Sequence, residues 1–85
     1  MTAFTCEVLV SLKHGLLDPQ GKAVEGSLPA MGFDNVTGVR VGKHIKLTVE
    51  AADEATATAQ VQEMAMRVLS NPVIEEFEVL DVAKA

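Results

Sequence analysis

The chain has 85 residues and a net charge of −5, with 7 Lys and Arg against 12 Asp and Glu. Neither nucleic acid nor an anionic membrane is expected as a main partner, because both require clustered positive charge. Apolar residues make up 48% of the sequence, which excludes disorder and predicts a single domain over residues 1–85.

The first predicted element is a strand over residues 4–13, where apolar and polar residues alternate. Phe4, Cys6 and Val8 fall on the predicted core face, and Leu9 falls on the opposite face. A buried thiol in such a position behaves as a small apolar group. Cys6 is therefore expected to be a core residue and not a nucleophile.

A helix is predicted to follow this strand. Asp18 can accept hydrogen bonds from the free amides of its first turn, and Pro19 suits the first helical position. Glycines and Pro29 weaken the helix, so a kink near Glu25 or an early end is expected. Gly32 is a plausible left-handed stop.

Two strands are then predicted over residues 36–42 and 45–50. Since only Gly42 and Lys43 connect them, they are expected to form an antiparallel hairpin.

A second helix is predicted to begin near Asp53 and to end at Asn71 and Pro72. A last strand is predicted over residues 74–82. The apolar stripe of the helix comprises Ala57, Val61, Met64 and Val68, widened by Ala65 and Leu69.

The element order β-α-β-β-α-β predicts an α+β, ferredoxin-like fold with two helices on one face of a four-stranded antiparallel sheet. A compact chain of this length has a radius of gyration of roughly 12 Å. Leu9, Leu80 and Val82 are expected on the open face of the sheet. Apolar residues there favour contact with another protein, most simply a second copy of the chain.

No catalytic, cofactor-binding or metal-binding residues are predicted. His14 and His44 lack further ligands at metal-binding spacing, so both are expected to be solvated. The one cationic cluster comprises Arg40, Lys43, His44 and Lys46. It is either a solvated hairpin or a docking surface for an acidic partner or a phosphate.

Three segments together resemble PurS, the small subunit of phosphoribosylformylglycinamidine (FGAM) synthase. They are Val10-Ser11-Leu12-Lys13 with Leu17-Asp18-Pro19-Gln20-Gly21; Gly32-Phe33 leading to Val39-Arg40-Val41-Gly42-Lys43, Ile45, Leu47 and Glu50; and Leu69-Ser70-Asn71-Pro72-Val73-Ile74-Glu75-Glu76-Phe77.

The resemblance implies a non-catalytic subunit of a ligase in purine biosynthesis, which converts FGAR to FGAM with ATP, magnesium and glutamine. It implies as partners a synthetase subunit (PurL), a glutaminase subunit (PurQ) and further copies of the chain, in a homo-dimer or tetramer. Arg40, Gly42 and Lys43 match the family's hairpin motif, and Arg40 and Lys43 are expected to contact partners. ATP-binding belongs to the complex, and no cofactor is expected on this chain.

The alternative is a regulatory domain of the ACT type, which shares the predicted element order and binds a small molecule between two copies. The cytoplasm is the expected location. A single cysteine fits a reducing compartment, and the sequence shows neither a signal peptide nor an apolar run of membrane-spanning length.

Overall fold

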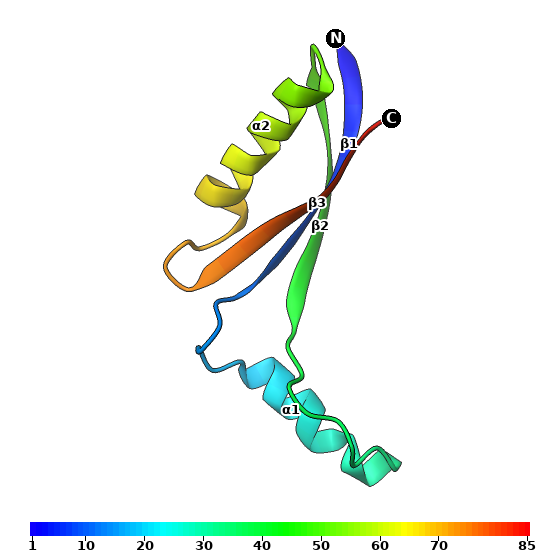
Figure 1. Cartoon of the computed structure of the whole chain (residues 1–85), viewed down its shortest axis with the longest axis vertical. Coiled ribbons are helices and arrows are strands. Elements are labelled where there is room, and N and C mark those ends of the chain that lie inside the picture. Colours follow the sequence, from blue (N-terminus) through cyan, green and yellow to red (C-terminus); the bar gives the residue numbers. More distant parts are fainter.

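A three-stranded antiparallel sheet forms the centre of the structure, a computed structural model that describes residues 1–85 (Figure 1). Strand β1 (Thr2–Leu12) lies between β2 (Gly42–Ala51) and β3 (Glu75–Lys84). The fold is α+β as predicted, with the order β-α-β-α-β. The prediction of a fourth strand is wrong, because residues 36–41 form no strand.

The alternation predicted for the first strand is confirmed. Phe4, Cys6, Val8 and Val10 are all buried on one face of β1. Both neighbouring strands bring apolar residues to the same face, so β1 is the centre of the core.

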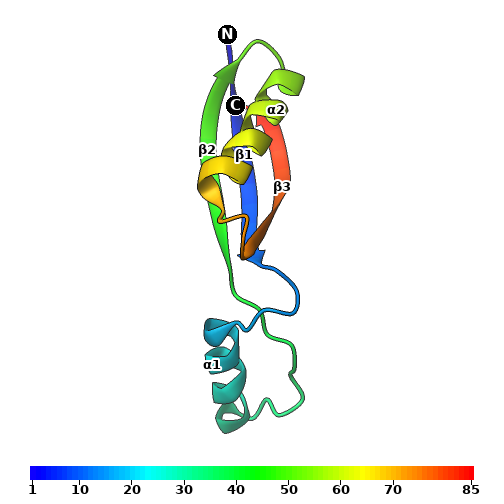
Figure 2. The ribbon, with the colours of Figure 1, turned by 90° about the vertical axis from the view of Figure 1, so that its left-hand side faces the viewer.

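Helix α2 (Glu54–Met64) covers this face of the sheet, as the two views in Figures 1 and 2 show. It begins after Asp53, whose carboxylate accepts a hydrogen bond of 2.8 Å from the amide of Thr56. Ala57 and Val61 are buried against the strands. The complete buried core contains Phe4, Cys6, Val8, Val10, Ala51, Ala57, Val61 and Ala65.

The last turn of this helix differs from the prediction. Residues Ala65–Leu69 form a π-helical turn, closed by a bond from the Ser70 amide to the Ala65 carbonyl. The wider turn leaves Leu69 against the core but turns Val68 outward, where 79% of it is exposed. Val68 was predicted in the apolar stripe, and that placement is wrong.

Helix α1 (Pro19–Ser27) confirms the predicted early end. Asp18 caps its first turn, Pro19 is its first residue, and a 3-10 turn (Pro29–Met31) replaces its last part. Gly32 has a φ of +94° and is the left-handed stop that the sequence predicts.

The predicted position of α1 is wrong, because this helix does not cover the sheet. It projects beyond the end of the sheet, on the side away from the two termini (Figures 1 and 2). We call residues 13–41, which include α1, the arm. The molecule measures 52 × 27 × 13 Å, and its radius of gyration is 16.4 Å, well above the roughly 12 Å of a compact chain.

A bulge in β3 overturns another placement. Glu7 pairs with Asp81 and Val8 pairs with Val79, so Leu80 has no partner of its own. The extra residue reverses the alternation beyond it, and Val82 pairs with Cys6 and packs against the core. Val82 was expected on the open face, and that expectation is wrong.

None of the helices is both long enough and apolar enough to cross a bilayer.

Candidate assembly surface on the arm

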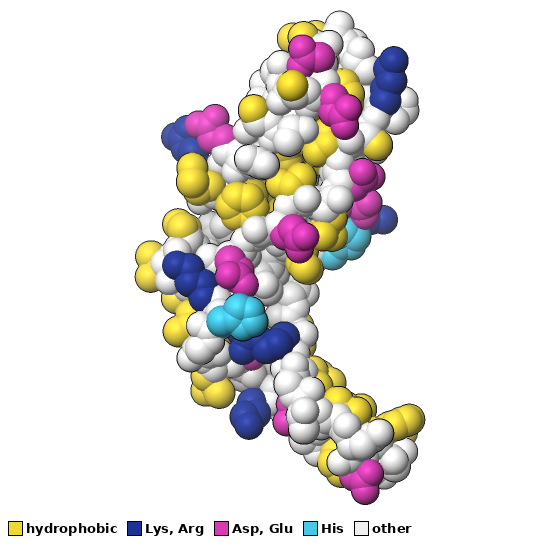
Figure 3. Space-filling model, in the orientation of Figure 1, with side chains coloured by type: hydrophobic (Ala, Val, Ile, Leu, Met, Phe, Trp, Pro, Cys, Tyr) yellow, Lys and Arg dark blue, Asp and Glu magenta, His cyan; other side chains and the backbone are white.

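The arm exposes most of its apolar side chains. Leu17, Met31 and Phe33 are 71%, 74% and 55% exposed, and Val24 and Val36 are also exposed. No apolar residue of the arm belongs to the buried core. Figure 3 shows apolar side chains gathered toward the free end of the arm. Contiguous apolar surface of this kind is typical of a protein-binding site.

Asp18 lies at the joint between the arm and the sheet. One oxygen of its carboxylate accepts the Gly21 amide at 2.9 Å, and the other accepts the Val41 amide at 2.8 Å. These two amides, and the nearby guanidinium of Arg40, hold the pKa of Asp18 below its ordinary value. Burial opposes the charge, but the hydrogen bonds outweigh it, so the buried carboxylate remains charged within the joint near neutral pH.

Arg40 also belongs to this joint. Its guanidinium donates to the carbonyls of Leu16, Leu12 and Lys13 at 3.0 to 3.2 Å, and its Nε lies 4.0 Å from the Asp18 carboxylate. The sequence predicts Arg40 as a partner contact, and that role stays a prediction. What the structure adds is that the guanidinium already binds four groups of its own chain.

The returning segment of the arm binds to α1 through a carboxylate. The amide of Val39 donates to the side chain of Glu25 at 3.1 Å, as Val41 does to Asp18. These bonds are one reason that residues 36–41 are not a strand. The predicted hairpin is therefore wrong: Gly42 and Lys43 are the first residues of β2 and not a turn.

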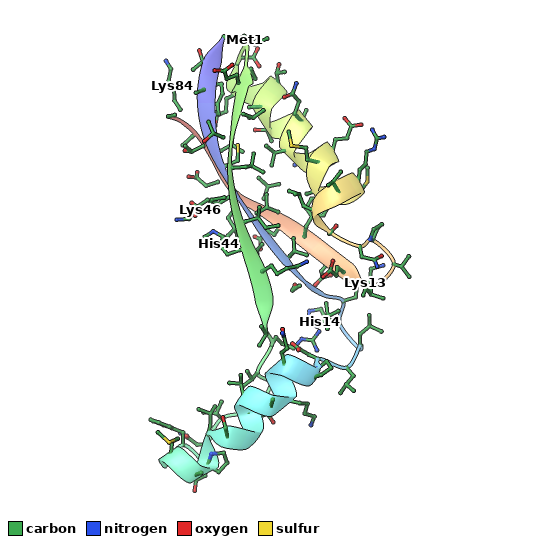
Figure 4. The ribbon with its side chains drawn as sticks, turned by 180° about the vertical axis from the view of Figure 1, so that it is seen from behind. Met1, Lys13, His14, His44, Lys46 and Lys84 are labelled. Carbon is green, nitrogen blue, oxygen red and sulfur yellow. The ribbon has the colours of Figure 1, made fainter.

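The predicted cationic cluster is not one surface. Lys43 forms an ion pair of 3.5 Å with Glu75 on β3. His44 and Lys46 project from the side of β2 away from α2, as Figure 4 shows, and the His44 Nε2 lies 2.9 Å from a Glu7 carboxylate oxygen. His44 is exposed as predicted, although it lies in a strand and not in a loop. His14 is exposed in a turn of the arm.

The residues proposed for the open face are also dispersed. Leu9 lies there and is half-buried, opposite His44 and Glu78. Leu80 is exposed in the bulge, beside the groove between β3 and α2. Of the three residues, only Leu9 has the predicted position without change.

The chemistry of the chain is limited. It has no group of three or more His, Cys, Asp or Glu side chains placed to hold a metal ion. Cys6 is buried in the core, and burial raises the pKa of its thiol, which opposes formation of a reactive thiolate. The structural features that this chain offers for function are its exposed surfaces.

Sequence reasoning missed the exposed apolar residues of the arm. Leu17, Val24 and Met31 lie in a segment whose pattern is typical of an amphipathic helix. Such a pattern predicts that one face is buried but does not identify the element that covers it. It also missed the role of Glu25. The weak helix over residues 18–32 was the one signal that this segment differs from an ordinary core helix.

The family model described as PurS, phosphoribosylformylglycinamidine (FGAM) synthase, matches residues 5–82. A protein of Synechocystis sp. named phosphoribosylformylglycinamidine synthase subunit PurS is 45% identical over 75 residues, which cover 88% of this chain and 75% of that protein.

Two solved structures have the same fold. PurS of Thermus thermophilus superposes with a TM-score of 0.88 and 35% identity, over 98% of each chain. A chain in the structure of PurLQS from Thermotoga maritima superposes with a TM-score of 0.84 and 32% identity, over the full length of both. Because these superpositions span nearly all residues, they include the projecting arm as well as the sheet.

Proposed function

The chain belongs to the PurS family, the small subunits of FGAM synthase in purine biosynthesis, and on that premise we propose that it is the adaptor of the synthase complex. In this role it brings a glutaminase subunit (PurQ) and a synthetase subunit (PurL) together. The observation that carries the proposal is the arm, whose apolar side chains remain exposed in the isolated chain. The PurLQS structure from Thermotoga maritima supports it, because the matching chain there is part of such a complex.

The mechanism that we propose is positional. Ammonia released from glutamine reaches the synthetase without mixing with water when the two larger subunits are held in register. We place ATP, magnesium and glutamine on those subunits, as the resemblance to the family implies. Its own contribution is binding.

We further propose that the chain self-associates as a dimer or tetramer. Eight buried apolar residues form a small core for a chain of 85 residues. Covering the exposed apolar side chains of the arm would therefore add stability to this elongated molecule. Leu9 and Leu80 remain candidates for these contacts. Sedimentation velocity would measure the oligomer, and a monomer at all concentrations would contradict this part of the proposal.

The cytoplasm is the location that we propose, since the only cysteine is a buried free thiol and no disulfide is needed for the fold. The ACT-like alternative requires two helices packed on a four-stranded sheet. This chain has neither feature, so no observation favours that alternative.

The test is a reconstitution with the cognate synthetase and glutaminase subunits. The rate of FGAM formation is measured with glutamine and, separately, with free ammonia, each with and without the chain. We expect the chain to be required for the glutamine reaction while much of the ammonia reaction is retained without it. Equal loss of both activities in its absence would refute the adaptor mechanism.

A pair of variants extends the test to the arm. Phe33→Ser removes apolar surface from the arm, and Val73→Ser removes it from the exposed loop before β3. We expect Phe33→Ser to raise the concentration of chain needed for half-maximal glutamine activity about tenfold, and Val73→Ser to leave it within twofold. The opposite order would place the assembly surface elsewhere.

A further inference from the structure

The orientation of the arm depends on very few contacts. Two chain connections join it to the sheet, one after β1 and one before β2. Among the helices and strands, α1 makes extensive contacts only with its own 3-10 turn, and none of its apolar side chains enters the core. A unit attached in this way would swivel unless polar contacts fix it.

Asp18 and Arg40 supply those contacts, and each joins both connections. The Asp18 carboxylate caps α1 through Gly21 and also binds the Val41 amide, 23 residues away and directly before β2. Arg40 comes from the connection before β2 and donates to the carbonyl of Leu12, the last residue of β1, and to those of Lys13 and Leu16 in the connection that follows. We call these two side chains and the groups that they bind the clasp.

The packing of α1 at this point is close enough to require glycine. A Cβ on Gly21 would collide with the carbonyl oxygen of Val39, whereas a Cβ on Gly26 would meet nothing within 4 Å. The helix therefore lies directly against the returning segment at its first turn, where the clasp is, whereas the side of the helix at Gly26 is open.

We propose that Asp18 and Arg40 are positioning residues of the synthase complex, which fix the angle of the arm to the sheet and so present both to the larger subunits as one rigid surface. This inference rests on the proposed function and adds to it the residues that prepare the surface. If only a fraction of free chains holds the competent angle, the dissociation constant rises by the inverse of that fraction.

A role limited to helix capping does not account for the geometry. One carboxylate oxygen is enough for the cap at Gly21, yet the second oxygen binds Val41. The guanidinium of Arg40 donates to three carbonyls, and none of these belongs to a helix. A fork of this geometry is specific to arginine, so lysine cannot replace it.

The first experiment measures the distance between the end of the arm and the sheet, which changes with the angle of the arm. Spin labels are attached to cysteines introduced by Ala30→Cys at the end of the arm and Thr48→Cys on the sheet, both exposed positions. Cys6 is buried and stays unlabelled. Labelled chain is diluted with unlabelled chain so that each distance lies within one copy.

The variants are Asp18→Asn and Arg40→Lys, with Lys22→Ala as the control for a change of a charged side chain on α1 outside the clasp. We expect one narrow distance distribution for the wild type and for Lys22→Ala, and a broad one for both clasp variants. Circular dichroism should report an unchanged sheet and α2. The apparent dissociation constant of the clasp variants for the two larger subunits should rise tenfold or more.

A second pair of variants changes the same joint without altering Asp18 or Arg40. Gly21→Ala should also broaden the distribution and weaken assembly, whereas Gly26→Ala, the same change in the same helix, should do neither. This pair decides the case if the charged variants fail to fold.

The other outcomes refute the inference. Narrow distributions in the clasp variants would mean that other contacts hold the arm, even if assembly were weakened. Broad distributions with unchanged assembly would mean that the angle does not matter. If the wild-type chain itself fails to restore the glutamine reaction, the adaptor function fails, while the distance distributions still decide whether the clasp holds the arm.

Discussion

The sheet with α2 and the arm are stabilised by different forces. In the first region eight apolar residues are buried between three strands and a helix, so the hydrophobic effect dominates. In the arm the apolar side chains face solvent, and its conformation depends on a few hydrogen bonds that Asp18 and Glu25 accept and Arg40 donates. The first region is therefore packed around a core of its own, whereas the second leaves its apolar surface uncovered.

The largest expected difference in stability is between two Val→Ala substitutions, one in each region. Val61→Ala removes two methyl groups from a fully buried site, and we expect it to lower the free energy of unfolding by about 2 kcal/mol. Val24→Ala acts on a side chain that is 44% exposed on the arm, and its effect should stay within about 0.5 kcal/mol. Urea denaturation followed by circular dichroism measures both.

Equal destabilisation by the two valine variants would contradict the division into a packed region and an unpacked arm. It would mean that α1 is buried in solution, which a self-associated chain could achieve. Repeating the denaturation at several protein concentrations separates these cases, because only association makes the midpoint depend on concentration.

A stabilising change should act on the arm alone. Gly26→Ala replaces a glycine inside α1 at a position where a Cβ meets no atom within 4 Å. The change should stabilise the helix by about 0.5–1 kcal/mol. We expect amide exchange in α1 to slow by about two- to fivefold while the amides of β1 keep their wild-type rates. Slower exchange in β1 as well would show that the two regions unfold together.

Acid should weaken the joint. The pKa values of Asp18 and Asp53 are held below their ordinary 3.8 by hydrogen bonds from backbone amides, chiefly those of Gly21 and Thr56. Because the folded carboxylates bind protons less readily than the unfolded ones, the stabilisation is complete above the ordinary pKa. It is lost as pH falls from about 4 through the lowered values.

Amide exchange and urea midpoints between pH 2 and pH 6 would follow this loss. In Asp18→Asn, which has no carboxylate at the joint, the pH dependence of the arm should flatten and that of α2 should remain. A steeper dependence of the arm in this variant would contradict the assignment to Asp18.

The smallest effect is expected on the open face of the sheet. The His44 and Glu7 side chains are 2.9 Å apart but partly exposed, and such pairs contribute roughly 0.2–1 kcal/mol. His44→Ala should therefore change the urea midpoint only slightly. Loss of more than 2 kcal/mol would show that this face is buried, as in an oligomer.

Local patterns in the sequence determined much of this protein. The alternation in β1 identified its buried face, because successive side chains of a strand point to opposite sides. Asp18 and Asp53 identified the starts of both helices, since a capping carboxylate acts within three residues of its own position. The motifs spread along the chain identified the family, which depends on residue types and spacing and not on packing.

The tertiary structure determined which elements pack against each other. Periodicity marks an apolar face but not its partner, so α1 was expected on the sheet although only α2 covers it. The bulge at Leu80 arises from the pairing of β3 with β1, which the sequence does not reveal. The inward position of Val82 follows from that bulge. Arg40 reads as a free cation in sequence. Its hydrogen bonds are to carbonyls 24 to 28 residues away, and only the folded chain brings these within reach.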